Sequence, residues 1–527
     1  MVPEAMTTRH APTGAVAAAN HLAAQAGAAL LDRGGNAVDA AVATAAAMAV
    51  TSPHMCGLGG DLFALVVAPG AAPVALNASG RAGSGADAER LRAEGRDRMP
   101  FRDDVRTVTV PGCVDGLVTL HDRFGSVSLA EAFAPAVRLA RDGFPVSDAL
   151  AAASDILSGA ARTQAFGAAE VLIGDRRLRL PRVARLLEDI AAAGRAAFYE
   201  GAAGEAFREI GPDLFDAADL QAMQAEWVAP LRLSVLGHDL WTTPPNSQGY
   251  LTLSSAWIAE ELGVPSDPED ETWAFTLVEA ARQAAHDRVA VLHEYADGER
   301  LLSVQRLAPR VEQVRDAASR GLADAYGDGD TTYLCAVDAD RVGVSLILSN
   351  AAGFGSHLLL PGYGIFLHNR GMAFSLEPGH PAEYGAGRRP PHTLSPLAIT
   401  RGDGSLAAVM GTMGGDAQPQ ILLQLLARSY LTGQQPGPAV SAPRWSLSRE
   451  PSTGFDVWER EDPPLVALEH SAPAAWEYGL RRRGYEVVRD AAGDPGFGHA
   501  QMIRVTDDDM MCGAADPRSR DGAWIGL

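Results

Sequence analysis

The chain has 527 residues, of which 47% are apolar, and carries a formal net charge of −21. This length and apolar content allow a large buried core, arranged as roughly two to four domains or as one large layered unit. The acidic balance leaves no basic surface for nucleic acid or an anionic membrane, so small molecules or proteins are the expected partners. No Pro/Gly/Ser-rich linker or internal repeat divides the chain, which favours one intertwined globular unit.

Residue types that are scarce or missing exclude several kinds of chemistry. Four cysteines lie far apart without a C-x-x-C pair, so neither a zinc site nor a disulfide scaffold is expected. All 44 basic residues are arginine, so no lysine is present for a P-loop, a Schiff base or Ser-Lys catalysis. No G-x-S-x-G or H-E-x-x-H motif occurs. We therefore expect no metal and no cofactor.

The N-terminal region shows no charged segment followed by an apolar one. The longest nearly unbroken apolar stretch, residues 40–50, is too short to cross a bilayer. We expect a cytoplasmic protein without a membrane partner.

Apolar periodicity predicts the following elements in chain order. Helices are expected over residues 15–31, 37–51, 129–142, 272–295 and 418–432. Strands are expected over residues 62–67, 74–77, 107–110, 331–337, 342–349, 394–399, 406–411, 500–505 and 510–514. Strands crowd the second half and helices the first, which suits sheets that are covered by helices on their outer faces.

A hydroxyl stands at the start of one predicted strand, in the run Asp330-Thr331-Thr332-Tyr333. Cleavage between Asp330 and Thr331 would give Thr331 a free α-amine beside its own Oγ, so that one residue holds both nucleophile and base. An α-amine titrates near ~7.7–8.0, close to working pH. The pattern alone also fits an ordinary turn before a strand.

Several ordered segments around Thr331 resemble the γ-glutamyltranspeptidase (γ-glutamyltransferase, glutathione hydrolase) family, most closely its cytosolic bacterial branch. The N-terminal signature covers residues 21–27, 33–44 and 53–61. The blocks after Thr331 cover residues 353–356, 361–365, 369–371, 411–416 and 515–519. The resemblance spans nearly the whole chain.

This resemblance implies an α+β fold, the four-layer αββα sandwich of the N-terminal-nucleophile hydrolases. It implies a self-processing zymogen that is cut at Asp330-Thr331 into a large subunit, residues 1–330, and a small subunit, residues 331–527. The two fragments would stay together as a heterodimer. Thr331 would attack a substrate amide to form an acyl-enzyme, which water or an acceptor amine then releases.

The resemblance also assigns candidate site residues. Gly414 and Gly415 match the pair that donates backbone N–H groups to the oxyanion. Arg81 corresponds to the arginine that holds the substrate α-carboxylate, a task that suits a guanidinium fork. Further polar groups around the nucleophile and the glutamyl head are expected from Ser349, Asn350, Arg370, His392 and Thr393.

The sequence departs from the family pattern where the acyl group is recognised. His392 and Thr393 replace the paired serines of the usual pocket. The aspartate that pairs with the substrate α-ammonium falls on Ala373, and Arg370 adds positive charge nearby. A buried ammonium without a carboxylate is costly. Asp416 is a candidate to supply the missing charge.

Three functions remain open at this point. The leading hypothesis is a γ-glutamyl hydrolase or transferase that acts on glutathione or other γ-glutamyl amides. The second is a glutaryl-type amidohydrolase, like the cephalosporin acylases, with the same nucleophile. The third is an uncleaved, non-catalytic binding protein.

Overall fold

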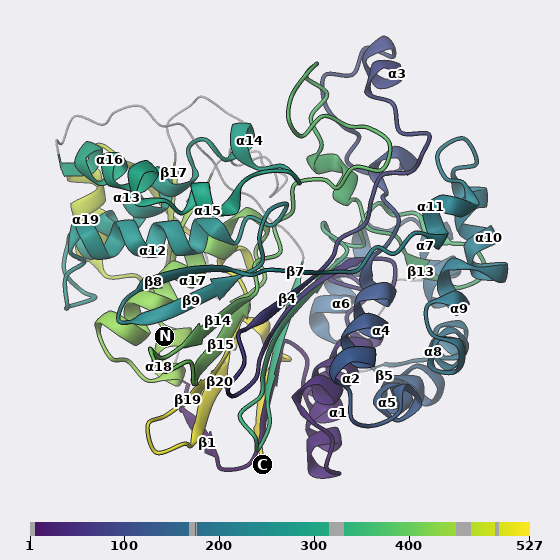
Figure 1. Cartoon of the computed structure of the whole chain (residues 1–527), viewed down its shortest axis with the longest axis horizontal. Coiled ribbons are helices and arrows are strands. Elements are labelled where there is room, and N and C mark those ends of the chain that lie inside the picture. Colours follow the sequence, from purple (N-terminus) through teal and green to yellow (C-terminus); the bar gives the residue numbers. More distant parts are fainter. Residues whose placement is uncertain (1–5, 168–173, 175, 316–330, 449–464, 491–494) are drawn as a thin grey trace.

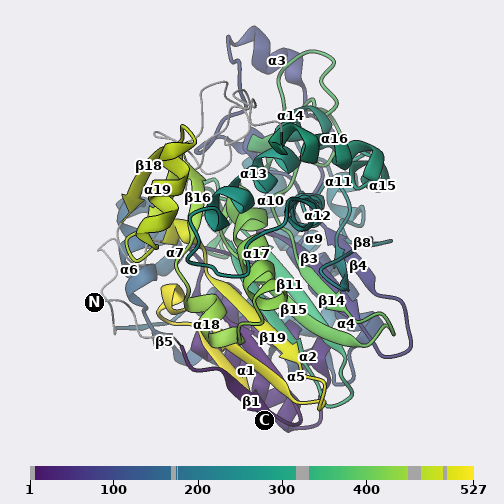
Figure 2. The ribbon, with the colours of Figure 1, turned by 90° about the vertical axis from the view of Figure 1, so that its left-hand side faces the viewer.

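The computed structural model describes residues 6–167, 174, 176–315, 331–448, 465–490 and 495–527. Two seven-stranded sheets lie face to face in the centre of the molecule, and helices cover the outer face of each, as Figure 1 shows. The view turned by 90° looks onto one helical layer, with long strands of the sandwich seen beside and below it (Figure 2). The fold is therefore the four-layer αββα sandwich that the resemblance predicts.

Both sheets are antiparallel throughout. The first, here called the β15 sheet, has the order β1 (Arg9–Ala11), β20 (Met511–Ala515), β19 (Ala500–Val505), β15 (Leu406–Thr412), β14 (Leu397–Thr400), β9 (His238–Thr242) and β8 (Leu231–Val235). The second, the β10 sheet, has the order β21 (Ala523–Gly526), β2 (Ala15–Ala18), β10 (Thr332–Val337), β11 (Gly343–Ser349), β3 (Asp61–Val67), β4 (Val74–Ala78) and β7 (Glu226–Val228).

Each sheet combines strands from both sides of the Asp330-Thr331 bond. In the β10 sheet, β10 lies between β2 and β11, and β11 pairs in turn with β3. In the β15 sheet, β9 from the first part pairs with β14 from the second. The parts before and after residue 331 are therefore interleaved in the sandwich.

Two helical layers complete the sandwich. The layer on the β10 sheet, on the right in Figure 1, contains α1 (His21–Asp32), α2 (Ala37–Thr51), α4 (Cys113–Phe124), α5 (Leu129–Asp142) and α8 (Pro181–Ala193). The layer on the β15 sheet contains α12 (Tyr250–Leu262), α13 (Trp273–Ala285), α16 (Val304–Arg315), α17 (Gln418–Leu426) and α19 (Ala474–Arg482).

Helix α2 illustrates why the first layer forms where it does. Asn36 caps its first turn, and Asp39 completes a capping box by accepting the Asn36 backbone N–H. Every residue of α2 is buried, because the helix packs against α1 and α5 and against the β10 sheet. Its many alanines permit this close approach on all sides.

Smaller elements surround the sandwich. The short helices are α3 (Ala88–Ala93), α6 (Asp148–Ala153), α7 (Gly159–Phe166), α9 (Ala196–Tyr199), α10 (Gly201–Ile210), α11 (Ala217–Gln221), α14 (Arg288–Val291), α15 (Gly298–Leu301) and α18 (Pro436–Ser441). The minor strands are β5 (Phe144–Pro145), β6 (Arg177–Leu178), β12 (Leu359–Leu360), β13 (Ile365–Phe366), β16 (Trp445–Ser448), β17 (Leu465–Glu469) and β18 (Glu486–Asp490).

Three sequence predictions are corrected by the structure. The helix expected over residues 15–31 starts only at His21, because residues 15–18 form β2 between β21 and β10. The strand expected over residues 107–110 is absent from this described stretch, which begins with a 3₁₀ turn, Val105–Thr107. The helix expected over residues 272–295 is divided into α13 and α14.

Candidate active site

Three neighbouring strands in the middle of the β10 sheet carry polar residues at their adjacent ends. Thr331 directly precedes β10, Ser349 ends β11 and Asp61 begins β3. The register pairs Ser349 with Asp61 and places Thr332 opposite Leu348, so Thr331 and Ser349 are neighbours across the strands. All three polar side chains are buried. The sheet thus holds a hydroxyl, a second hydroxyl and a carboxylate in one row.

The predicted nucleophile has a specific hydrogen-bond partner. Thr331 Oγ1 lies 3.0 Å from Ser349 Oγ. Ser349 Oγ also accepts the backbone N–H of Ala351 at 2.8 Å. This second bond fixes the Ser349 hydroxyl, which in turn orients the Thr331 hydroxyl.

Gly414 and Gly415 follow β15 at the same end of the sandwich as Thr331. A Cβ on Gly411 would lie 2.3 Å from the Tyr333 ring, so the end of β15 packs against the start of β10. Gly414 has φ 134° and Gly415 has φ 50°, conformations that glycine adopts most readily. The fold therefore brings the predicted oxyanion-hole pair to the end of the sandwich where the predicted nucleophile lies.

Asp61 organises the site beneath these residues. Its Oδ1 accepts the backbone N–H groups of Gly80 at 3.0 Å and Gly112 at 3.1 Å. Its Oδ2 lies 3.1 Å from His392 Nε2 and 3.5 Å from His368 Nδ1. Burial alone would raise the pKa of Asp61, but the two histidines and the Gly80 N–H outweigh it and lower the pKa to about 2. Asp61 is therefore a buried carboxylate that ties together four segments.

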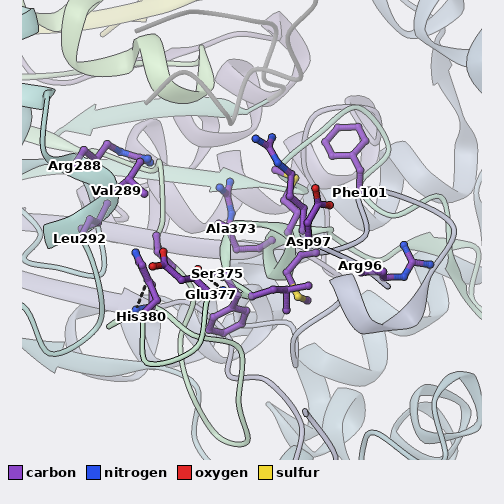
Figure 3. Close-up of a pocket in the computed structure, with 18 of the residues that line it drawn as sticks. Arg96, Asp97, Phe101, Arg288, Val289, Leu292, Ala373, Ser375, Glu377 and His380 are labelled. Carbon is purple, nitrogen blue, oxygen red and sulfur yellow. Dashed lines mark hydrogen bonds between the residues drawn. The ribbon is translucent and has the colours of Figure 1, made fainter. Parts of the chain in front are cut away.

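A cavity of about 490 Å³ adjoins Thr393, the residue after His392; Thr331 is not part of the cavity wall that the structure describes. Figure 3 shows Arg288 and Leu292 on one side of it, Arg96 and Phe101 on the other, and Ala373 between them. Its wall also includes Arg370, Thr393, Asp97, Glu377 and His380. A volume of this size suits a small-molecule ligand.

Two of the predicted site residues line the cavity, Arg370 and Thr393. Arg370 is 1% exposed, and burial lowers its pKa to about 10, which leaves the guanidinium charged at pH 7. The Thr393 hydroxyl is buried, and no residue in the described part of the chain hydrogen-bonds to it. A cation and a hydroxyl thus belong to the cavity wall, with their polar atoms covered by neighbouring protein groups.

His392 faces Asp61 instead. Its Nε2 donates to Asp61, while its Nδ1 accepts the backbone N–H of Leu394 at 3.3 Å. Burial, with the positive charge of Arg370, lowers the pKa of His392 to about 3, so the ring is neutral at pH 7. The structure places His392 in the support of the site, one residue from the cavity wall.

Asp416 is already paired. It is fully buried, and its Oδ1 lies 3.0 Å from Arg288 Nη2. Arg288 lines the cavity, whereas Asp416 is absent from the part of the wall that the structure describes. The Asp416 carboxylate, which was expected to pair with a substrate ammonium, therefore pairs with Arg288.

Arg81 and Asn350 lie near the site but bind protein groups. Arg81 Nη1 donates to Glu294 Oε2 at 3.2 Å and to the Gly387 carbonyl at 3.1 Å. Within the described wall of the cavity, Arg81 does not occur. Asn350 Nδ2 donates to the Pro53 carbonyl at 3.2 Å. The substrate-binding roles of Arg81 and Asn350 stay predictions.

Asp330, one half of the predicted cleavage bond, lies outside the described residues. Among the residues that are described, no group of three or more His, Cys, Asp or Glu side chains is placed to hold a metal ion. No helix in that same part of the chain is long and apolar enough to span a membrane.

Sequence reasoning missed two residues of the site. Asp61 has a local signal, since it follows two glycines and begins an apolar strand in the N-terminal block. Arg288 has none, because it falls in a stretch that reads as one continuous helix and reaches the site only through the break between α13 and α14.

Comparisons with known proteins concern the family and the fold of the chain. The sequence profile described as gamma-glutamyltranspeptidase matches residues 23–526. The chain is 35% identical to oxamate amidohydrolase proenzyme of Klebsiella pneumoniae, covering 97% of this chain and 98% of that protein. It is 34% identical to glutathione hydrolase-like YwrD proenzyme of Bacillus subtilis, with the same coverage.

A solved structure matches over the whole fold as well. The cephalosporin acylase from Bacillus halodurans superposes with a TM-score of 0.89 and 30% identity, covering 100% of this chain and 98% of that one. Profile, relatives and fold agree over nearly the full length. The chain belongs to the γ-glutamyltranspeptidase family of N-terminal-nucleophile hydrolases.

Proposed function

We propose that this protein is a self-processing amidohydrolase with Thr331 as its nucleophile. In this proposal the chain is cut between Asp330 and Thr331, and fragments 1–330 and 331–527 remain associated through their shared sheets. Support comes from the buried Thr331 hydroxyl, its 3.0 Å contact with Ser349 and the Gly414-Gly415 pair at the same end of the sandwich, called the diglycine below. The two relatives reported above are both named as proenzymes.

The proposed reaction has two halves. Thr331 Oγ attacks the amide carbonyl carbon, and the new α-amine takes the hydroxyl proton. The amide C–N bond then breaks, the leaving amine takes that proton, and the acyl group stays on Thr331 as an ester. Water attacks this ester, again with the α-amine as base, and releases the carboxylic acid. In both halves the N–H groups of Gly414 and Gly415 stabilise the oxyanion.

The substrate is proposed to be an amide whose acyl group ends in a carboxylate and lacks an α-ammonium. The observation that carries this choice is the cavity wall, where Arg288 and Arg370 are present and Ala373 stands at the position of the ammonium-pairing aspartate. The Asp416 carboxylate is paired with Arg288. A carboxylate in this cavity gains charge-assisted hydrogen bonds, whereas a buried ammonium would need a carboxylate partner.

A γ-glutamyl substrate is the second candidate. Asp97 and Glu377 also line the cavity, and either carboxylate is a possible partner for an α-ammonium. Transfer of the acyl group to an amine, as opposed to water, would use the same acyl-enzyme. The cavity wall therefore supports both acyl classes, and Arg370 favours the ammonium-free class, because the charge of Arg288 is already paired with Asp416.

Intact mass and two anilide substrates test the proposal. Wild-type protein is expected to give two fragments, Thr331→Ala one unbroken chain, and Thr331→Ser, which keeps a hydroxyl, two fragments again. The processed enzyme is expected to release aniline faster from a glutaryl anilide than from a γ-glutamyl anilide. Faster use of the γ-glutamyl anilide would favour the second candidate, and cleavage of Thr331→Ala would refute the nucleophile.

A further inference from the structure

Gln248 is a buried residue that links the diglycine to the cavity wall. It lies between β9 and α12 and is 0% exposed. Its Nε2 donates to the Gly415 carbonyl at 3.0 Å and to the Thr393 carbonyl at 3.2 Å. Its backbone N–H donates to the His392 carbonyl at 2.9 Å. One side chain thus connects the predicted oxyanion hole to the segment that carries Thr393.

Arg288 holds Gln248 in place from the other side. Its Nε donates to Gln248 Oε1 at 2.9 Å, which directs both Nε2 hydrogens toward the two carbonyls. Its Nη2 contacts Asp416, the residue after the diglycine, at 3.0 Å. Arg288 is 8% exposed and lines the cavity. The same guanidinium therefore touches Gln248, Asp416 and the substrate space.

The diglycine needs such external contacts, because glycine has little conformational preference of its own. The Gly414 carbonyl accepts the Ala417 N–H at 2.8 Å. The Gly415 carbonyl accepts the Gln248 side chain. Because a carbonyl and the next residue's N–H share one plane, the bond to the Gly414 carbonyl fixes the direction of the Gly415 N–H. The Gln248 bond holds the following peptide group, between Gly415 and Asp416, and so limits rotation on the other side of Gly415.

We propose that Gln248 is a positioning residue for catalysis, which anchors the C-terminal side of Gly415, keeps the Gly415 N–H in place for the oxyanion and is itself oriented by Arg288. This inference rests on the proposed function, because it requires that the diglycine stabilise an oxyanion. Donors fixed before the reaction lower the barrier without reorganisation. Loss of Gln248 should therefore weaken transition-state binding and leave ground-state binding nearly unchanged.

Gln248→Glu is the informative substitution. It keeps the size of the side chain and the acceptor for Arg288, but removes both donations to Gly415 and Thr393. Gln424→Glu is the matched control. Gln424 is also buried, its Nε2 donates to the carbonyls of Gln420 and Trp445, and its Oε1 accepts the Trp445 N–H, all away from the diglycine.

The expected result is a fall in kcat of about 10- to 100-fold for Gln248→Glu with KM changed less than about threefold, since complete loss of an oxyanion donor costs about 10²- to 10³-fold. Gln424→Glu should keep the wild-type kcat. A boronic-acid analogue of the acyl group, which forms a tetrahedral adduct on Thr331, should lose affinity for Gln248→Glu in proportion to kcat. The free dicarboxylate product should bind as before.

Arg288→Lys provides a second variant if Gln248→Glu fails to fold. It keeps a cation beside Asp416 and removes the bond to Gln248 Oε1, so a smaller loss of kcat is expected. Equal kcat in Gln248→Glu and Gln424→Glu, or a change confined to KM, would overturn the positioning role. A wild-type chain that is neither cut nor active would instead contradict the proposed function, so the two failures are distinguishable.

Discussion

Removal of the Ser349 hydroxyl tests how the fold prepares its nucleophile. Ser349→Ala deletes the contact to Thr331 Oγ1 at 3.0 Å and leaves the Ala351 N–H without its side-chain acceptor. Losing a partner for a buried polar group costs about 1–3 kcal/mol. If that cost falls on the transition state, it slows the reaction by about 5- to 150-fold. Both self-cleavage and turnover should slow, because both use the Thr331 hydroxyl.

Ser345→Ala is the matched control. Ser345 lies on the same strand, β11, is equally buried, and its Oγ lies 2.8 Å from the hydroxyl of Tyr333 on β10. The control thus breaks a contact between two hydroxyl groups on neighbouring strands, at Tyr333, two residues after the nucleophile. It should lower stability by a similar amount and leave self-cleavage and kcat within about twofold of wild type.

The assay follows the fraction of cut chain by intact mass after purification, and then kcat and KM of the processed enzyme with the preferred anilide. Thermal unfolding of both variants shows whether their stabilities fall equally. If Ser349→Ala matures and turns over like Ser345→Ala, the Thr331–Ser349 contact has no part in the chemistry and the reasoning is wrong.

Two further predictions concern charge. Burial lowers the pKa of His54 and His392 to about 3 and that of His499 to about 4. Between pH 6.5 and about 4 these histidines bind protons in the unfolded chain but not in the folded one. The free energy of unfolding should therefore fall as the pH drops, by about 4 kcal/mol in total from pH 7.5 to pH 5.5. A Tm that stays constant from pH 7.5 to 5.5 would contradict this. Arg370→Gln should raise KM for a glutaryl anilide about tenfold or more and Arg81→Gln less than about threefold, since Arg370, unlike Arg81, is part of the cavity wall that the structure describes. A larger rise in KM for Arg81→Gln would instead indicate that Arg81 binds the carboxylate.

Local patterns in the sequence predict many of the helices and strands of the fold. Strands β10 and β11 and helices α2 and α5 are predicted nearly at their observed bounds. The first three are continuous, mainly apolar buried runs, and α5 is amphipathic with one buried face. The ordered motifs also indicate the family and hence the sandwich. They place Thr331 at the head of a strand before any tertiary contact is known.

Local patterns fail where a neighbour in space overrides them. Residues 15–18 are Ala-Val-Ala-Ala, which favours helix, yet they form β2 because pairing with β10 and β21 supplies every backbone hydrogen bond in a buried sheet. Periodicity likewise merges α13 and α14, although the break between them is what brings Arg288 to the cavity.

The sequence by itself determined the family, the layered fold and the candidate nucleophile, because these depend on local periodicity and on motifs of fixed spacing. Only the tertiary structure decided that His392 faces Asp61 across 331 residues of sequence, that Asp416 is paired with Arg288, and that Gln248 joins the diglycine to the cavity wall. Such contacts join residues whose separation along the chain carries no period. They are set by which strands and helices pack together.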